Sequence, residues 1–403
     1  MVSKTKLLVV ACSKGATEKL AREMYDLLSG DYGLEGQIEL LIGLEKDDIP
    51  RGTAKDHRHD LVCDFFPDKE VRIDIGKNQL GGVFYGKHVV IVEHLLTPDQ
   101  PTSVNDHKEK VRGLLDVMSK VETLQRTLVA PYTTNVRSHS TEKYEARGFY
   151  QFDSLRKMLE DFKRDGLNGL VTIDPHSDKL MQIAGDLGMF THCANPFQSG
   201  RAINPYKLGL SGENAVEVLK RLRPFQERLA KMREQGKSVY LISVDDGTER
   251  RAENFTERAL LELPPEEAYL RLAYLYKDRS TIDTHSMGFK PFSRINQGNV
   301  PPGIYVCIDD MISSGGTGND AGKLIKTHQP EARVELWVSH SVSMPADYGK
   351  VRALTHVDRI VSLDTVPQRA GKEDGLNVEI IPASAHLLAS ELYKAHAKLV
   401  ASR

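Results

Sequence analysis

The chain has 403 residues, of which 40% are hydrophobic and 27% charged, with a formal net charge of −2 and a sequence pI near 6.7. These values are typical of a globular protein of two or three domains, and they give no basic surface that would favour a nucleic-acid partner. No run of about 18 apolar residues occurs, so we expect no membrane span. The four scattered cysteines favour reduced thiols in the cytoplasm over a disulfide framework.

The N-terminal part of the chain predicts a strand and a helix followed by an irregular stretch. Residues 7–11 form a short apolar run, and the apolar residues from Leu20 to Leu28 have helical spacing. Residues 37–60 are polar and irregular, and they contain His57 and His59. These two histidines could bind a metal, but we favour a solvated loop because two histidines in a charged loop are weak evidence.

Candidate ligand residues lie directly before or after the next predicted strands. Phe66, Asp68 and Glu70 precede residues 71–75, whose alternation of apolar and polar side chains predicts a half-exposed strand. Apolar strands are also predicted at residues 88–93, 127–132 and 170–173. Arg137 follows the second of these strands, and Asp174 and His176 follow the third. From the residues alone, Arg137 is either a ligand of a substrate or part of a surface loop.

Residues 213–236 predict one long charged helix, and residues 239–244 predict a buried strand that ends at Asp245. Leu270 to Tyr276 predicts a further strand, followed by Lys277 and Arg279. Residues 280–302 are rich in Gly, Pro, Ser and Thr and lack a hydrophobic period, so we expect a functional or disordered loop there.

The most informative stretch is residues 303–317. Ile304 to Ile308 is an apolar run that predicts a buried parallel strand ending at two adjacent acids, Asp309 and Asp310. Two serines, two glycines and a threonine follow, and then an amphipathic helix. Ligands of open α/β sheets bind at the carboxyl ends of the strands, where a helix N-terminus favours a phosphate. Two acids beside a phosphate would repel it, unless they bind a divalent cation or sugar hydroxyls.

Residues 303–317 resemble the 5-phosphoribosyl 1-pyrophosphate (PRPP) loop, in which an apolar strand leads to two aspartates and then to a Ser/Thr-Gly-Gly-Thr segment. The stretches at residues 66–70, 131–137, 174–176, 245–247, 277–279, 334–340 and 359–367 are similar, in the same order, to segments of the PRPP synthetases. Residues 245–247 and 313–316 are closer to the plant-type second class of that family.

The resemblance implies an α/β protein with two phosphoribosyltransferase-type domains, each a mostly parallel sheet flanked by helices. We expect the first domain to hold residues 1–195 and the C-terminal helix at 384–403, and the second to hold residues 196–383 with the PRPP loop. The active site would lie between the domains and near a subunit interface of a homo-oligomer.

The implied reaction is transfer of a diphosphoryl group from MgATP to the 1-hydroxyl of ribose 5-phosphate, giving PRPP and AMP. The resemblance assigns catalysis to Lys277 and Arg279, ATP binding to Phe66, Asp68, Glu70 and Arg137, ribose-phosphate binding to Asp245, Asp309, Asp310, Ser313, Ser314, Gly315, Gly316 and Thr317, and Mg²⁺ binding to His176 and Asp245. Two alternatives remain open. The acceptor is a different ribosyl compound such as ADP-ribose, or the chain is a non-catalytic regulatory homologue.

Overall fold

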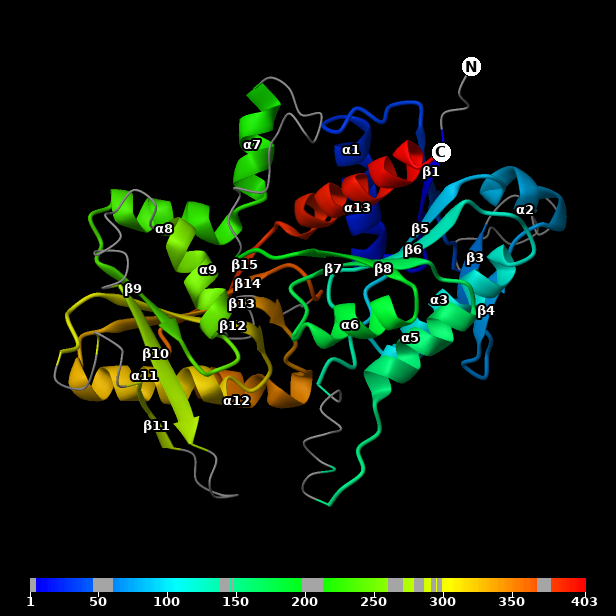
Figure 1. Cartoon of the computed structure of the whole chain (residues 1–403). Helices are drawn as coiled ribbons and strands as arrows, with labels where there is room; N and C mark the ends of the chain where they lie inside the picture. Colours follow the sequence, from blue (N-terminus) through cyan, green and yellow to red (C-terminus); the bar gives the residue numbers. More distant parts are fainter. Residues whose placement is uncertain are drawn as a thin grey trace. The chain divides into compact units, whose positions relative to one another are not determined.

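The computed structural model describes residues 5–45, 61–137, 145, 148–197, 213–259, 271–278, 286–290, 295, 299–367 and 378–403. The chain divides into two compact units (Figure 1). The first contains the described residues up to Ala194 together with residues 213–218 and 384–403, and the second contains residues 195–197 and the described part of Leu219–Ala383. Within the described ranges, no helix is both long enough and apolar enough to cross a membrane.

The first unit is built on a six-stranded parallel sheet with the strand order β2-β1-β5-β6-β7-β8. Its strands are β1 (Leu7–Ala11), β2 (Ile38–Ile42), β5 (His88–Val92), β6 (Gln125–Ala130), β7 (Gly169–Ile173) and β8 (Phe190–Ala194). The inner strands β1, β5 and β7 are fully buried because helices cover both faces of a parallel sheet. The strand order changes direction between β1 and β5, which is where such sheets bind ligands.

The helices of this unit are α1 (Ala16–Ser29), α2 (Lys77–Phe84), α3 (Val104–Met118), α5 (Ser154–Arg164), α6 (Lys179–Asp186) and α13 (Ser384–Ala401). The C-terminal helix α13 packs against α1, β7 and β8. A separate antiparallel hairpin, β3 (Val62–Phe65) and β4 (Val71–Asp74), packs on α3. The contact is close, since a Cβ at Gly113 of α3 would lie 2.9 Å from Cγ1 of Ile73.

The second unit has a seven-stranded sheet with the order β11-β10-β9-β12-β13-β14-β15, in which only β10 and β11 pair in antiparallel fashion. Its strands are β9 (Val239–Ser243), β10 (Leu272–Asp278), β11 (Ser286–Phe289), β12 (Ile304–Ile312), β13 (Arg333–Ser341), β14 (Arg359–Leu363) and β15 (Val378–Ile381). Its helices are α8 (Pro224–Glu234), α9 (Glu249–Ala259), α11 (Gly316–His328), the short 3₁₀ helix η4 (Pro345–Asp347) and α12 (Tyr348–Arg352). The order changes direction between β9 and β12.

Helices lie on both faces of the second sheet (Figure 1). Helices α8 and α9 pack together beside β9, and α11 and α12 are drawn on the other side of the sheet (Figure 1). The buried indole of Trp337 in β13 stacks on Phe225 of α8, with ring centroids 5.6 Å apart. The predicted fold class, mostly parallel sheets flanked by helices, is confirmed.

Outside residues 303–317, three predictions of local structure are wrong. The single helix predicted at 213–236 is two helices, α7 (Glu213–Arg221) and α8, because Pro224 has no N–H to continue a helix and instead occupies the first turn of α8. Residues 38–42 form the edge strand β2 inside the stretch predicted to be irregular. Residues 286–289 form β11 inside the predicted loop. His57 and His59 lie outside the described residues.

Candidate functional site

The two acids of the PRPP-like motif lie inside β12, which continues past them. Pairing with β9 ends at Ile308, whereas pairing with β13 continues to Ile312. The prediction that the strand ends at Ile308 is therefore wrong, because β13 still supplies hydrogen-bonding partners beyond that point. Asp309 and Asp310 lie where β12 extends past β9, at the carboxyl edge of the sheet. Asp310 is buried, with 5% of its surface exposed, and Asp309 is partly buried.

The segment after β12 leads directly into the N-terminus of α11. Gly315 precedes the helix with a φ of +78°, and a Cβ there would lie 2.6 Å from Cδ1 of Leu354. Both the backbone angle and the lack of space require glycine. The hydroxyl of Ser343 donates a 2.6 Å hydrogen bond to the carbonyl of Ser313 and so fixes the start of the loop. N–H groups of a first helical turn have no partner within the helix, so this geometry suits an anion.

A second turn, after β9, lies at the neighbouring strand end. Oδ1 of Asp245 accepts a 3.1 Å hydrogen bond from the N–H of Thr248, and the N–H of Asp245 donates to Oγ1 of Thr248 at 3.2 Å. The hydroxyl of Ser243 lies 3.0 Å from that same Oγ1 atom. These bonds hold the carboxylate of Asp245 at the point where the chain enters α9.

The carboxylates of the two strand ends influence each other. Burial raises the pKa of Asp309 well above its usual range, and the negative charges of Asp310 and Asp245 raise it further. A hydrogen bond from the N–H of Asp310 to Oδ1 of Asp309, 2.9 Å long, acts in the opposite direction. The two strand ends therefore bring together carboxyl groups whose charges oppose one another.

A cluster of carboxyl groups suits a hard divalent cation, which binds oxygen ligands. Among the described residues, no group of three or more His, Cys, Asp and Glu side chains already forms a metal site. Mg²⁺ is commonly held by one or two carboxylates together with substrate phosphates and water. The carboxyl groups of Asp309, Asp310 and Asp245 are of the type that can hold a magnesium ion.

Lys277 lies near the end of β10, in a hairpin with β11. Lys277 pairs with Met287, and Asp278 pairs with Ser286. The hairpin places the backbone of Lys277 two strands from β12 in the sheet order β10-β9-β12. Arg279 lies outside the described residues.

Arg137, predicted to bind ATP, and His176, predicted to bind Mg²⁺, lie at the carboxyl edge of the first sheet. Arg137 follows β6, His176 follows β7, and both are exposed. The two strands are neighbours, so their ends lie at the same edge of the sheet. Asp174, between β7 and His176, is buried and has a positive φ of 33°. Its N–H donates a 2.7 Å hydrogen bond to the carbonyl of Ala194 in β8.

The other predicted ATP-side residues form the tip of the β3–β4 hairpin. Phe66, Asp68 and Glu70 are exposed there, and Asp68 Oδ1 accepts a 3.2 Å hydrogen bond from the N–H of Glu70. The guanidinium of Arg72 lies 5.6 Å from the centre of the Phe66 ring. The exposed ring and carboxylates are accessible to a ligand.

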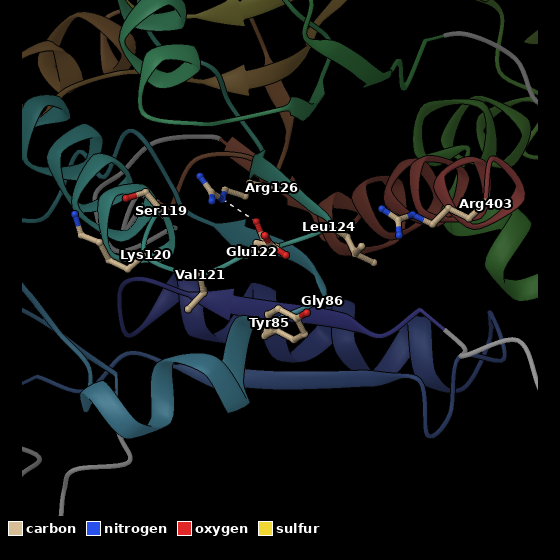
Figure 2. Close-up of a pocket in the computed structure, with 10 residues that line it drawn as sticks. Tyr85, Gly86, Ser119, Lys120, Val121, Glu122, Leu124, Arg126 and Arg403 are labelled. Carbon is tan, nitrogen blue, oxygen red and sulfur yellow. Dashed lines mark hydrogen bonds between the residues drawn. The ribbon is translucent and has the colours of Figure 1, made fainter.

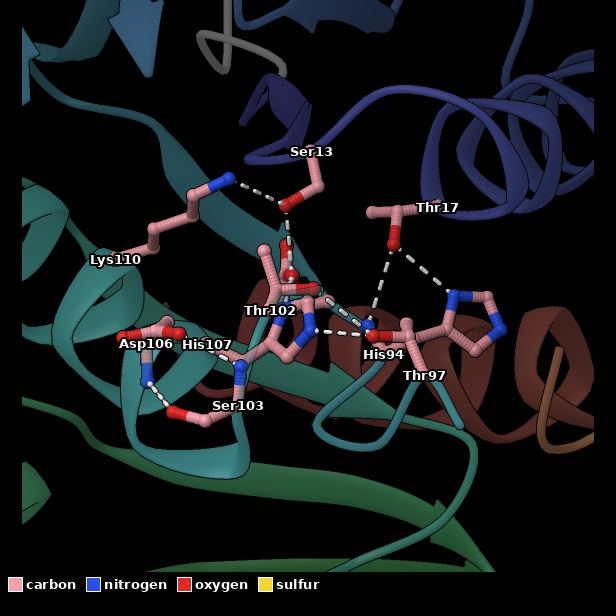
Figure 3. A network of polar contacts seen from close by, with 10 residues as sticks. Ser13, Thr17, His94, Thr97, Thr102, Ser103, Asp106, His107 and Lys110 are labelled. Atoms are coloured by element: carbon pink, nitrogen blue, oxygen red, sulfur yellow. Dashed lines mark hydrogen bonds and ion pairs between the residues drawn. The ribbon is translucent and has the colours of Figure 1, made fainter. Parts of the chain in front are cut away.

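A buried polar network occupies the point of the first sheet where the strand order changes direction (Figure 3). Oε1 of Glu93 accepts hydrogen bonds from Ser13 at 2.8 Å and from His107 at 2.6 Å. Lys110 donates to the Ser13 hydroxyl at 3.2 Å, and its ammonium lies 4.8 Å from the centre of the Phe65 ring. This position is filled by the protein's own side chains, so we assign no substrate to it.

A pocket of about 700 Å³ lies at the opposite edge of the same sheet (Figure 2). Gly86 and Leu124, which precede β5 and β6, line it together with Tyr85 and Arg126. Nε of Arg126 donates a 2.9 Å hydrogen bond to Thr123. Because it lies at the amino ends of the strands, this pocket is separate from Arg137 and His176.

Several supporting residues were not predicted from the sequence. Ser343 holds the loop after β12, Leu354 packs against Gly315, and Thr248 holds Asp245. The imidazole Nδ1 of buried His340, in β13, lies 2.8 Å from the hydroxyl of Thr365. These are contacts between segments that are distant in sequence or depend on a turn geometry, and no local motif indicates them.

A search of solved structures identifies a similar fold. The crystal structure of phosphoribosylpyrophosphate synthetase from Mycobacterium smegmatis aligns with 98% of this chain and 99% of its own, with a TM-score of 0.65 and 16% sequence identity. At this identity, the similarity establishes the fold alone. No family model matches the sequence, and no curated protein sequence matches it.

Proposed function

We propose that this chain is a ribose-phosphate diphosphokinase that transfers a diphosphoryl group from MgATP to the 1-hydroxyl of ribose 5-phosphate. The products are PRPP and AMP. The observation that carries the proposal is the arrangement at the end of β12, where the acids Asp309 and Asp310 are followed by Gly315 at the N-terminus of α11. The full-length similarity in fold to a PRPP synthetase supports it.

In this proposal, the second unit binds the acceptor. Ser313, Ser314, Gly315, Gly316 and Thr317 hold the 5-phosphate at the helix N-terminus, where N–H groups and hydroxyls donate hydrogen bonds. Asp309 and Asp310 accept hydrogen bonds from the ribose hydroxyls. Asp245 faces the ribose phosphate. Fixing the acceptor orients its 1-hydroxyl for in-line attack on the β-phosphorus of ATP.

The first unit supplies the nucleotide contacts. Arg137 binds ATP phosphates, and Phe66, Asp68 and Glu70 bind the adenine side. Their exposure at the tip of a hairpin suits contact with ATP on a neighbouring subunit, so we expect a homo-oligomer. We expect it to work in the cytoplasm.

His176 of the first unit and Asp245 of the second are the residues that would hold magnesium. Bound magnesium supplies positive charge that offsets the charge of the phosphates during transfer. Lys277 and Arg279 contribute two further cations. Charge stabilisation of this kind supplies most of the rate enhancement in phosphoryl transfer.

Product analysis tests the proposal. The purified chain is incubated with MgATP and ribose 5-phosphate, and products are separated by anion-exchange chromatography and identified by ³¹P NMR. We expect AMP and PRPP in equal amounts, with ADP only as a trace. ADP in stoichiometric amounts would indicate transfer of a single phosphoryl group and would refute the proposal.

The same assay with ADP-ribose tests the alternative acceptor. Ser313 supports this alternative, because the best-known PRPP synthetases carry an acid at this place in the loop. AMP formed with ADP-ribose but not with ribose 5-phosphate would identify a different ribosyl acceptor. Absence of AMP with every acceptor would favour a regulatory homologue.

A further inference from the structure

Lys290 connects the β10–β11 hairpin to the start of α9. It is the first residue after β11, and its N–H donates a 2.8 Å hydrogen bond to the carbonyl of Tyr274 in β10. Its side chain turns to α9, where the ammonium contacts the carboxylate of Glu249 and lies 2.5 Å from Oδ1 of Asp246. The main chain of Lys290 is therefore part of the hairpin. Its ammonium group forms ion pairs with Asp246 in the turn after β9 and with Glu249 at the start of α9.

The ion pair between Lys290 and Glu249 is less exposed to solvent than an ordinary surface ion pair. The Lys290 side chain is 17% exposed and Glu249 is 28% exposed, whereas Asp246 is 76% exposed, so water screens the pair with Glu249 less than the pair with Asp246. Burial lowers the pKa of Lys290, but hydrogen bonds with Asp246 and Glu249 outweigh it, and the net shift is upward. The ammonium therefore remains charged at neutral pH.

A second bond ties the same two elements together further along. The hydroxyl of Tyr274 in β10 donates a 3.0 Å hydrogen bond to Oε1 of Glu253, one turn after Glu249 in α9. The hairpin is thus held to α9 at two successive turns of the helix. Removing Lys290 would remove the contact nearer to Asp245 and leave the bond between Tyr274 and Glu253.

Both connected elements carry residues of the proposed reaction. Lys277 in β10 pairs with Met287 in β11, and Met287 lies three residues before Lys290. Asp245 lies immediately before Asp246, the partner of Lys290. A displacement of about 1 Å between catalytic groups can reduce a rate about 100-fold.

We propose that Lys290 is a positioning residue, which fixes the hairpin that carries Lys277 against the Asp245 turn through its contacts with Asp246 and Glu249. This inference rests on the proposed diphosphoryl transfer. In this inference Lys290 acts through Asp246 and Glu249 and not by binding a substrate. Its removal should therefore lower kcat and leave acceptor binding nearly unchanged.

The test compares three variants in the product assay. Lys290→Met keeps the length of the side chain and removes its charge, and we expect kcat to fall between about 10- and 100-fold while KM for ribose 5-phosphate changes less than about threefold. Lys290→Arg keeps the charge and should restore most of kcat. Lys326→Met is the matched control, because Lys326 is 20% exposed and pairs with Asp358 at 2.7 Å near the far end of α11. Its kcat should stay that of the unchanged chain.

Hydrogen exchange gives a readout that needs no turnover. Local opening exposes backbone amides, so β11 amides should exchange faster in Lys290→Met than in Lys326→Met. An unchanged kcat in Lys290→Met would overturn the inference, as would a loss of kcat that Lys290→Arg does not rescue. If the unchanged chain makes no AMP, the proposed function fails, and hydrogen exchange still decides whether Lys290 holds the hairpin.

Discussion

The N–H of Asp310 donates a 2.9 Å hydrogen bond to the carboxylate of the preceding residue, Asp309. This bond favours an ionised Asp309, while burial and the neighbouring charges of Asp310 and Asp245 oppose ionisation and raise its pKa overall. Folding thus brings together carboxylates that repel each other. Such a cost is expected at a site that binds a cation or several hydroxyl groups, since the bound group then relieves it.

Replacing Asp309 by asparagine should stabilise the protein. The amide oxygen of the new side chain would still accept the bond from the N–H of Asp310, and the buried negative charge would be removed. Because the folded-state pKa of Asp309 is raised, its carboxylate lowers the free energy of unfolding as pH rises above the unfolded value of about 4. We expect Asp309→Asn to raise the free energy of unfolding by about 1 to 2 kcal/mol near neutral pH, and hardly at all near pH 4.

Denaturant unfolding at both pH values in the absence of divalent cations measures this effect. Glu331→Gln is the control, because Glu331 is exposed and the same change in charge should alter stability by less than about 0.5 kcal/mol. Added Mg²⁺ should reduce the difference between Asp309→Asn and the unchanged chain. A loss of stability in Asp309→Asn at neutral pH would contradict the repulsion.

Gly315→Ala should destabilise the loop after β12. Its φ of +78° costs a non-glycine residue about 1 to 2 kcal/mol, and its Cβ would lie 2.6 Å from Cδ1 of Leu354. Gly316→Ala provides a matched comparison. A Cβ at Gly316 meets only the Ser314 hydroxyl at 4.0 Å, and alanine in a first helical turn should be neutral or stabilise by about 0.4 to 1 kcal/mol.

Thermal unfolding of both glycine variants decides the matter. The double variant Gly315→Ala with Leu354→Ala separates the two contributions, because it relieves the steric contact and leaves the backbone cost. Equal melting temperatures for Gly315→Ala and Gly316→Ala would show that the loop does not depend on the geometry of Gly315.

The buried pair His88 and His396 should make the first unit sensitive to acid. The Nδ1 atoms of the two rings lie 3.1 Å apart, and the rings stack with centroids 5.3 Å apart. Burial lowers the pKa of His88 to about 3 and that of His396 to about 4. Both rings therefore stay neutral in the folded protein, whereas in the unfolded chain they take up protons below about pH 6.5.

The contribution of these histidines to the free energy of unfolding should consequently be complete above about pH 6.5. It should decrease as the pH is lowered, by up to about 1.4 kcal/mol per pH unit for each histidine. Thermal unfolding between about pH 7 and about pH 4.5 measures the slope. His396→Gln should make the slope shallower, because one of the buried histidines that take up protons on unfolding is removed. An unchanged slope in His396→Gln would show that this histidine does not contribute.

The sequence predicted the elements whose patterns are local. Ile304 to Ile308 is apolar and β-branched, and the glycines after Asp310 mark a turn, so the strand, the acids and the helix of the motif were found. The extension of β12 to Ile312 depends on β13, whose pairing the local pattern does not contain. The break between α7 and α8 could have been predicted from Pro224, because proline in a helix interior removes a hydrogen bond. The helical periodicity of the charged residues on both sides of Pro224 instead favoured a single helix.

The supporting contacts could not be predicted from the sequence for a different reason. Ser343 lies 30 residues after the carbonyl that it holds, and Lys290 lies 41 residues after its partner Glu249. Serine and lysine are common on surfaces, so their type gives no signal. Only the register of β11 beside β10 and the packing of α9 bring Lys290 to its partners.

Ser313→Asp tests whether the natural loop is adapted to ribose 5-phosphate. Ser313 is partly buried, directly follows β12, and has its carbonyl held by Ser343. A carboxylate there would add negative charge to a segment that already follows Asp309 and Asp310. Two charges about 4 Å apart near a protein surface interact by about 4 kcal/mol before screening, so even a longer separation should weaken phosphate binding.

We expect Ser313→Asp to raise KM for ribose 5-phosphate about tenfold, equivalent to about 1.4 kcal/mol, with a smaller change in kcat. Ser313→Asn adds nearly the same bulk without the charge and should raise KM much less. Steady-state kinetics at saturating MgATP measures both variants. An improved kcat/KM for ribose 5-phosphate in Ser313→Asp would mean that the natural serine serves another acceptor.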